Sequence, residues 1–460
     1  MPPLSYAPPP GPAPVPDLTA ARPLPPVHPL PLPSHLPSLP TPQRPSSFPG
    51  YTLTTHLTPC ARPRASLTAT RRAIRPAYPP SVEQQSSTPA AKANRAKEVK
   101  QLTAQLWEQR DEVYSSPSWA STAQEEQEAP QLWAVVNRFL REEQASRGVT
   151  LFLLHSNGMT KETWEPVVGS VLRLYPVDEV LVWETYNHGD AALINAPHLG
   201  DTYDWADNAR DVLQFLTYHR PLTNARAPLH LPPHDKEAEP RKVIGLGHSY
   251  GGVVMLRAAL DSPELFSCLI PVEPLARPAS SYGRLLHPSG GWNGLRQSTL
   301  SRRSVWPSLE EARSFFLRSP FFKAWHPAVL HAHLSSALFP HPSSPGAVAL
   351  KQSPYDEVLC YFDPPEPGET WALLPALDGR VEIRWVMGKD PETFTGGEAI
   401  ARELVWRRRG RTSNVVFQEA GHFIPQEAPE RLAQEVVDVL MRRHGPPAQK
   451  ISQAPVQARL

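Results

Sequence analysis

A serine with the surroundings of a catalytic nucleophile lies near the middle of the chain. Residues 243–246 form a short apolar run, and apolar residues recur at helical spacing from 253 to 260. The sequence GHSYG at 247–251 joins them in the G-x-S-x-G arrangement, a turn too tight for side chains two residues from the serine. The pattern predicts that Ser249 stands at the end of a strand, with a helix N-terminus behind it to favour negative charge. The alternative is a glycine-rich turn with a surface serine.

Candidates for the base and the acid follow other strand-like runs. A serine hydroxyl attacks at neutral pH only when a base takes its proton and a carboxylate holds that base in the right tautomer. His422, in the sequence EAGHF after the last run, is the expected base, with an ordinary loop histidine as the alternative. Asp390 follows the preceding run and is the favoured acid. Glu273, one strand earlier, is the rival, and Asp390 can instead begin a turn with Pro391.

Backbone donors for an oxyanion are expected at two turns. One is the N–H of Tyr250, directly after the nucleophile, and the other is the N–H of Asn157 in the loop 155–158. A simpler interpretation of that loop is a strand-to-helix turn. Residues 186–190 (YNHGD) follow another strand at the same edge, where their polar groups suit either substrate orientation or the turn alone.

These residues require a sheet that brings their loops to one edge. Strand-like runs at 150–154, 177–183, 243–246, 269–272, 381–387 and 414–417 alternate with helical patterns at 162–174, 205–216, 253–260, 398–406 and 431–443, and 132–140 is expected to open the sheet. The alternation predicts an α/β fold, with a mostly parallel sheet covered by helices on both faces. Right-handed crossovers then place the loops after the strands along one edge.

The rest of the chain divides by composition. Of the 57 prolines, 25 lie in residues 1–90, which predicts a disordered segment with polyproline II character. Residues 91–130 are interpreted as a helical linker, 131–274 and 379–445 as the two parts of the core, and 446–460 as a flexible tail.

Residues 275–378 interrupt the alternation with prolines and aromatic residues. We expect a helical lid over Ser249, with a helix that begins at Ser308 because Glu311 completes a capping box. The aromatic side chains either line an apolar substrate pocket or only pack the lid onto the core. They are Tyr282, Trp292, Trp306, Phe315, Phe316, Phe321, Phe322 and Trp325.

Composition argues against several other functions. The net charge is +1 and no basic face carries interleaved aromatic residues, so nucleic acid is not an expected partner. The three cysteines are too few for a disulfide framework or a zinc site, and no apolar run approaches the ~20 residues of a membrane span. No metal is expected at the histidines crowded in the lid, because they lack acidic or cysteine partners: His326, His331, His333 and His341.

Two sequences predict protein partners. Ala458, Arg459 and Leu460 form a close variant of the peroxisomal S-K-L address, after a polar stretch that leaves it accessible. The expected partner is the peroxisomal import receptor and the expected location is the peroxisomal matrix, with the cytoplasm as the alternative. PxxP sequences in residues 1–90 make an SH3-type domain a second candidate partner.

Several short motifs occur in a familiar order between residues 149 and 444. They are HSNGMTKETWEPVV, NHGDAA, WADNARD, GHSYGG and VEP. This stretch resembles the α/β-hydrolase superfamily, and within it a fungal group of serine hydrolases that includes peroxisomal lipase-like proteins and enzymes of toxin biosynthesis. The resemblance implies an eight-stranded sheet with a helical lid, no cofactor, Ser249 and His422 as triad members, and peroxisomal import. The pair His155-Ser156 departs from the common His-Gly pair, and residues 1–90 lie outside the resemblance.

The sequence therefore favours a serine hydrolase that cleaves esters or thioesters with apolar acyl groups. The alternative is a catalytically silent α/β-hydrolase fold that binds a hydrophobic ligand, or a scaffold with a proline-rich interaction tail.

Overall fold

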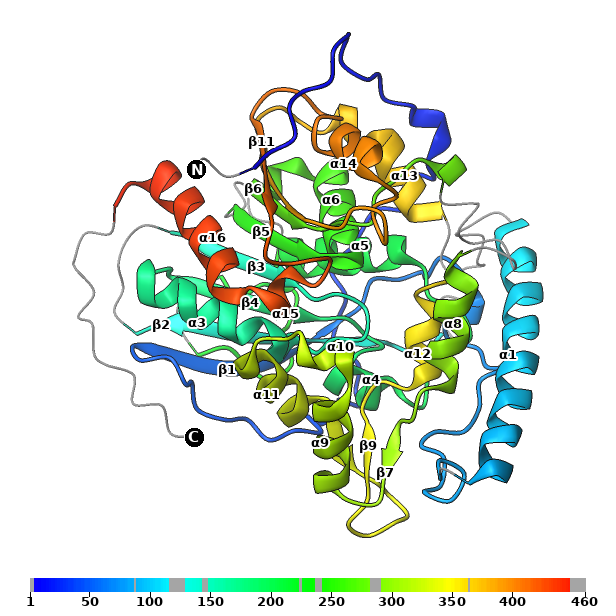
Figure 1. Cartoon of the computed structure of the whole chain (residues 1–460). Coiled ribbons are helices and arrows are strands. Elements are labelled where there is room, and N and C mark those ends of the chain that lie inside the picture. Colours follow the sequence, from blue (N-terminus) through cyan, green and yellow to red (C-terminus); the bar gives the residue numbers. More distant parts are fainter. Residues whose placement is uncertain are drawn as a thin grey trace.

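An eight-stranded sheet runs through the structure in the order β1-β2-β4-β3-β5-β6-β10-β11 (Figure 1). The structure is a computed structural model and describes residues 4–86, 88–115, 129–142, 148–222, 226–235, 242–281, 291–362 and 365–446. The strands are β1 (Tyr51–Pro59), β2 (Trp133–Arg141), β3 (Thr150–Leu154), β4 (Glu179–Glu184), β5 (Val243–His248), β6 (Phe266–Val272), β10 (Glu382–Gly388) and β11 (Thr412–Phe417).

The mostly parallel sheet confirms the predicted fold class. All neighbouring pairs from β4 to β11 are parallel, whereas β2 is antiparallel to both β1 and β4. The run at 132–140 is indeed a strand, but it is the second of the sheet and not the first. Crossover connections bring the carboxyl ends of β3, β5, β6, β10 and β11 to one edge.

Helices cover both faces of the sheet, as the alternating pattern predicts. They are α3 (Glu165–Leu174) and α16 (Pro429–His444) on one face, and α5 (Trp205–Gln214), α6 (Tyr250–Asp261) and α14 (Glu398–Val405) on the other. Alternate residues of β3 explain this, because Leu151 and Leu153 join the core under α3 while Phe152 and Leu154 join the core under α6. The remaining elements of the body are α1 (Pro89–Ser115), η3 (Lys161–Trp164), α4 (Gly189–Asn195), η4 (Phe215–His219) and α15 (Ile424–Glu427), with the short turns η1 (Leu18–Ala20), η2 (Leu67–Ala69), η5 (Pro263–Leu265) and η6 (Leu374–Ala376).

Residues 4–86 belong to the folded body, which corrects the expectation of a disordered segment at 1–90. Tyr51–Pro59 is the edge strand β1, paired with all nine residues of β2. Leu57 is fully buried, and burying a leucine side chain contributes about 1.5–3 kcal/mol. The threonine-rich sequence YTLTTHLTP favours a strand, and the prolines around it favour extended backbone that an edge tolerates.

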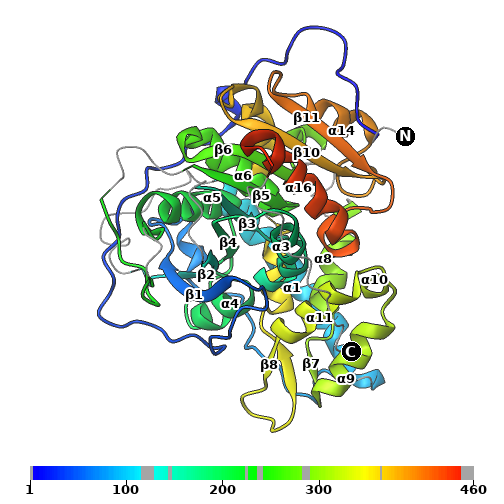
Figure 2. The same cartoon turned by 90° about the vertical axis from the view of Figure 1, so that its left-hand side faces the viewer.

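The first part of this segment crosses from one edge of the sheet to the other (Figures 1 and 2). Leu4 forms a bridge to Val416 in β11, at the edge opposite β1. Between these points Arg22 lies 2.6 Å from both Asp204 and Glu369. Residues 4–59, which we call the N-terminal strap, are therefore held by apolar, backbone and ionic contacts.

The insertion between β6 and β10 forms a cap on one side of the body (Figure 2). Ser308 caps the helix that begins at Leu309, accepting a hydrogen bond from the N–H of Glu311 as expected. The cap contains a three-stranded sheet, which a purely helical lid does not include. Its elements are α8 (Gly291–Ser301), β7 (Val305–Trp306), α9 (Leu309–Arg318), α10 (Pro320–Lys323), α11 (Pro327–Ser336), β8 (Leu338–Pro340), β9 (Val348–Leu350) and α12 (Pro354–Leu359). The last helix of the insertion, α13 (Pro365–Leu373), packs against α6 of the body (Figure 1).

Candidate active site

Ser249 occupies the tight turn between β5 and α6. Its backbone has φ 57° and ψ −122°, outside the regions that side-chain-bearing residues favour. A Cβ atom at Gly247 would clash with the Gly251 carbonyl, and one at Gly251 would clash with the His155 carbonyl. Both positions therefore require glycine, and the strained serine conformation is of the kind that costs ~1–3 kcal/mol and recurs at functional sites.

His422 lies beside Ser249, in the loop after β11. Its Nε2 atom is 3.0 Å from Ser249 Oγ, which is hydrogen-bond distance. The Phe394 ring stacks on the imidazole with centroids 4.1 Å apart, and His248 Nε2 donates to the His422 carbonyl at 2.8 Å. The imidazole is thus held on one face, and its backbone is tied to the serine turn.

The carboxylate that contacts His422 is that of Glu273, directly after β6. Its Oε2 atom is 3.2 Å from His422 Nδ1, and its Oε1 atom accepts the Gly388 N–H at 2.5 Å. Glu273 has φ 45°, and its own N–H donates to the Val386 carbonyl at 2.9 Å. These bonds hold a buried side chain against the imidazole from the neighbouring strand β10.

This geometry corrects the preference for Asp390 over Glu273. Asp390 lies on the surface, where its carboxylate accepts a hydrogen bond from Thr393 Oγ1 at 2.9 Å. The residue follows β10 as expected, but it begins a turn with Pro391, whose carbonyl accepts the N–H groups of Gly396 and Gly397. Asp390 thus begins a turn, as the alternative interpretation of the Asp-Pro pair predicts, and its carboxylate contacts Thr393 instead of the imidazole.

The loop after β3 packs directly against the serine turn. Asn157 and Tyr250 line the same cavity as Ser249. The Asn157 side chain is fixed from two sides, because its Nδ2 donates to the Glu357 carbonyl at 3.0 Å and its Oδ1 lies 3.1 Å from His188 Nε2. Tyr250 and Asn157 therefore share the cavity of the nucleophile, and the role of their backbone N–H groups remains a prediction.

Two buried histidines support this loop. His155 Nδ1 contacts the Ser156 carbonyl at 2.8 Å, and its Nε2 contacts the Thr185 N–H at 3.2 Å, which requires the tautomer protonated at Nδ1. Burial lowers the pKa of His155 to about 4 and that of His188 well below its usual value. Both rings are therefore neutral at pH 7, and they serve as fixed polar supports.

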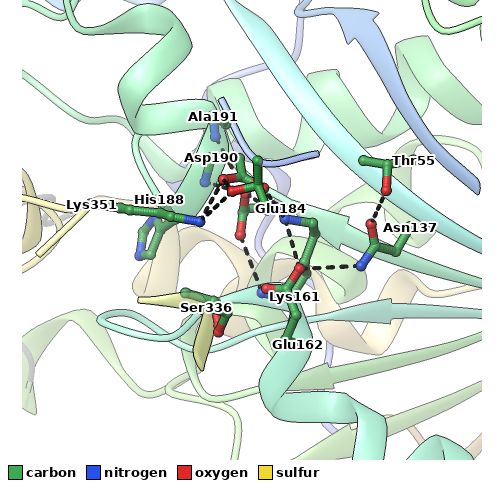
Figure 3. Close-up of polar contacts among 12 residues, drawn as sticks. Thr55, Asn137, Lys161, Glu162, Glu184, His188, Asp190, Ala191, Ser336 and Lys351 are labelled. Atoms are coloured by element: carbon green, nitrogen blue, oxygen red, sulfur yellow. Dashed lines mark hydrogen bonds and ion pairs between the residues drawn. The ribbon is translucent and has the colours of Figure 1, made fainter. Parts of the chain in front are cut away.

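A buried network of charges lies beneath the same loop (Figure 3). Lys161 Nζ is 3.1 Å from Glu184 Oε1 and 3.0 Å from Asp190 Oδ2, and Lys351 Nζ from the cap is 2.6 Å from Asp190 Oδ1. Burial alone would lower the pKa of Lys161, but the carboxylates of Glu162, Glu184 and Asp190 outweigh it and raise that pKa well above its usual value. The network joins the loop after β3, the end of β4, the first turn of α4 and the cap.

A cavity of about 610 Å³ extends from Ser249 and His422 into the cap, within the usual range for small-molecule sites. Its aromatic walls are formed by Phe315, Phe316, Phe321, Phe322, Phe394 and Phe423. Of the aromatic residues expected to line a pocket, four phenylalanines do so, whereas Trp292, Trp306 and Trp325 are packed in apolar clusters. Tyr282 lies outside the described residues.

The family model described as the alpha/beta hydrolase family matches residues 151–435, more than half of the 460 residues. The chain belongs to the alpha/beta hydrolase family. This confirms the resemblance noted for residues 149–444. A solved structure, the peroxisomal alpha-beta-hydrolase Lpx1 from Saccharomyces cerevisiae, agrees in fold, with a TM-score of 0.56 at 18% identity over 89% of this chain and 95% of that one.

Three curated relatives of this chain are fungal. The peroxisomal membrane protein LPX1 of S. cerevisiae is 26% identical over 48% of this chain and 58% of its own length. The type I acyl-CoA thioesterase mpaH of Penicillium brevicompactum is 28% identical over 36% of this chain and 34% of its own length. The abhydrolase domain-containing protein AFT2-1 of Alternaria alternata is 28% identical over 43% of this chain and 82% of its own length. The chain thus spans little more than half of the first of these relatives and about a third of the second.

The candidate site contains several residues that sequence reasoning missed. Lys161, Glu184 and Lys351 were not recognised, although Glu184 ends β4 at the edge that carries the nucleophile. A charged residue at the carboxyl end of a strand whose middle is apolar is the signal that could have indicated it. No metal-binding group of three or more suitable side chains occurs within the described ranges. Where the helices are described, none is long and apolar enough to cross a membrane.

Proposed function

We propose that the chain is a serine hydrolase that cleaves carboxylic esters or thioesters with apolar acyl groups. The observation that carries this proposal is the buried line of hydrogen bonds from Ser249 Oγ to His422 Nε2 and from His422 Nδ1 to Glu273 Oε2, at 3.0 and 3.2 Å. It gives each of the three groups the partner that nucleophilic acyl transfer requires.

The reaction begins when Ser249 Oγ attacks the substrate carbonyl carbon and its proton passes to His422 Nε2. Glu273 holds the Nδ1 proton and stabilises the imidazolium that forms. The N–H groups of Tyr250 and Asn157 bind the oxyanion. His422 then returns the proton to the leaving oxygen or sulfur, and an acyl-enzyme remains. Water then attacks this ester while His422 takes its proton. His422 returns the proton to Ser249 Oγ, and the carboxylic acid is released.

The cavity supports an apolar acyl group as the substrate portion that is bound. Phenylalanine rings form much of its wall. The charges of Arg302 and Glu357 beside them neutralise each other, with 3.0 Å between Arg302 Nη1 and Glu357 Oε1. A search for the substrate should test thioesters as well as esters, because the P. brevicompactum relative is named as an acyl-CoA thioesterase.

Labelling with a fluorophosphonate probe tests the proposal without knowledge of the substrate. We expect an adduct on Ser249 that is lost in Ser249→Ala and strongly slowed in His422→Ala. Ser298→Ala is the matched control, because Ser298 lines the same cavity but donates to the Leu295 carbonyl at 2.9 Å. A folded wild-type protein that resists the probe and hydrolyses no p-nitrophenyl ester or acyl-CoA would instead favour a ligand-binding role.

We also propose a peroxisomal location, because the yeast relative and the similar yeast structure are both described as peroxisomal proteins. Ala458, Arg459 and Leu460, the expected contacts of the import receptor, lie outside the described residues. A fluorescent protein fused before residue 1 should enter peroxisomes, and deletion of residues 458–460 should leave it in the cytoplasm. Retention in peroxisomes after the deletion would exclude this triplet as the address.

A scaffold role for the N-terminal segment has less support than the hydrolase proposal. Tyr6, Leu24 and Val27 pack against the apolar core under α6. An SH3-type domain would therefore compete with these contacts for the proline-rich sequence.

A further inference from the structure

His333 is a polar residue without a polar partner in the wall of the cavity. It lies on α11, only 4% of its surface is exposed, and it is among the residues that line the cavity. Its Nδ1 atom has no hydrogen-bond partner among the described residues. Because Nδ1 is covered by protein atoms, a ligand in the cavity reaches the imidazole at its other edge, where no described side chain supplies a polar partner.

A continuous row of rings connects His333 with the catalytic histidine. Phe423 contacts His422 with centroids 5.2 Å apart, and Phe321 contacts Phe423 at 4.9 Å. Phe322 contacts Phe321 at 4.9 Å and stacks on His333 at 5.8 Å. All five rings line the cavity. An acyl group bound along this row would have its carbonyl at Ser249 and a more distant part at His333.

Gln352 is a second such group in the cap wall of the cavity. It is 9% exposed, and its Nε2 atom has no hydrogen-bond partner among the residues that the structure describes. These two nearly buried side chains, each with an unpaired nitrogen, lie in a cap wall that also contains four phenylalanines and the hydroxyl groups of Ser298, Thr299 and Ser319. An entirely apolar ligand would form no hydrogen bond with either side chain.

The charges around His333 select a neutral ligand group. Burial and, to a smaller extent, the charge of Arg302 directly after α8 together lower the pKa of His333 to about 4. Arg302 is itself paired with Glu357 on α12, at 3.0 Å. The imidazole is therefore uncharged at pH 7 and offers one donor and one acceptor, which suits a hydroxyl or a ketone better than a carboxylate or phosphate.

We propose that His333 recognises a hydroxyl or keto oxygen on the acyl group, so that the preferred substrates are hydroxyacyl or oxoacyl esters or thioesters. This inference rests on the proposed hydrolase function. It makes His333 a specificity residue that touches the substrate at a distance from the scissile bond. Ser249, His422 and Glu273 act on both types of acyl group alike.

Matched ester pairs test the proposal on the wild-type protein alone. We would measure kcat/KM for p-nitrophenyl esters of ω-hydroxyalkanoic acids of increasing chain length, each beside its unsubstituted alkanoate and its ω-carboxylate. At the length that reaches His333 we expect the hydroxy ester to be favoured roughly tenfold or more, because its analogue leaves the imidazole unpaired. Absence of a preference at every length, or a preference for the carboxylate, would overturn the inference.

Variants then assign the preference to this residue. His333→Phe should bring the ratio of the two kcat/KM values to about one while the unsubstituted ester is still hydrolysed, and His333→Asn should retain part of the preference. His331→Phe is the matched control, because His331 is exposed on the same helix and the same substitution there should leave the ratio unchanged. A preference that survives in both His333 variants would refute the assignment.

Fluorophosphonate labelling separates this inference from the proposed function. If Ser249 is labelled but the ester pairs show no preference, the hydrolase proposal stands and the role of His333 fails. If Ser249 is not labelled and no ester is cleaved, the hydrolase proposal fails together with this one.

Discussion

Replacing Glu273 by glutamine changes one atom in the candidate triad and reverses the tautomer of His422. Gly388 donates its N–H to Glu273 Oε1 at 2.5 Å, so the carbonyl oxygen of the new amide must face Gly388. The amide NH₂ group then faces His422 Nδ1, 3.2 Å from the carboxylate oxygen it replaces. Two donors cannot share this hydrogen bond, and His422 must therefore carry its proton on Nε2.

The protonated Nε2 atom can no longer accept the Ser249 proton. We expect kcat/KM to fall about 10²–10⁴-fold in Glu273→Gln, which corresponds to about 3–5.5 kcal/mol of transition-state stabilisation. The assay compares p-nitrophenyl ester hydrolysis and the rate of fluorophosphonate labelling in the variant and the wild type. Thermal unfolding of both proteins verifies that the variant is folded.

Asp390→Asn is the matched control, because it makes the same carboxylate-to-amide change at the other candidate acid. Asp390 is exposed and contacts Thr393, so we expect activity within about twofold of the wild type. The reasoning would be refuted if Asp390→Asn lost activity while Glu273→Gln kept it. It would also fail if a folded Glu273→Gln variant hydrolysed esters as fast as the wild type.

Three further predictions concern the surroundings of the site. Lys351→Met removes the cap's ion pair with Asp190 and should lower the free energy of unfolding in urea by about 3–5 kcal/mol, whereas an effect below about 1 kcal/mol would show that the network does not hold the cap. The folded state keeps His333 neutral down to about pH 4 while the unfolded chain binds a proton below about pH 6.5, so stability is lost as the pH falls through this window. Between these pH values, the free energy of unfolding of the wild type should fall by about 1.4 kcal/mol per pH unit relative to that of His333→Phe. A difference between the two free energies that does not change with pH in denaturant melts would contradict the pKa direction. Leu57→Ala in β1 should cost about 2–5 kcal/mol by thermal or urea unfolding, and no loss would indicate that the strap is not part of the core.

The order of strands and helices from β3 onward could be predicted because each element carries its own pattern. The buried strands are short apolar runs, and the helices between them place apolar residues on one face. The turn at Ser249 is equally local, since the positions of Gly247 and Gly251 follow from clashes within a few residues and with the adjoining loop. Patterns of this kind need no knowledge of the rest of the fold.

The N-terminal strap could not be predicted in this way because its stability comes from distant partners. The nine residues of β1 pair with β2, more than 70 positions later in the chain. Arg22 is paired with Asp204, the N-cap residue of α5, and with Glu369 on α13. Proline-rich composition indicates only that a segment is extended, and extended segments are as suitable for an edge strand as for a disordered tail.

The choice between Glu273 and Asp390 shows the same limit within the active site. Both residues follow strands that end at one edge of the sheet, and β6 and β10 are neighbours, so strand order favours neither. Glu273 is fixed beside the imidazole by hydrogen bonds to β10. Its N–H donates to the Val386 carbonyl, and its carboxylate accepts the N–H of Gly388. These bonds depend on the register of the pairing, which relates Val386 to Val272. A carboxylate one strand away from the expected place therefore reaches the imidazole, and only the three-dimensional arrangement distinguishes it from its rival.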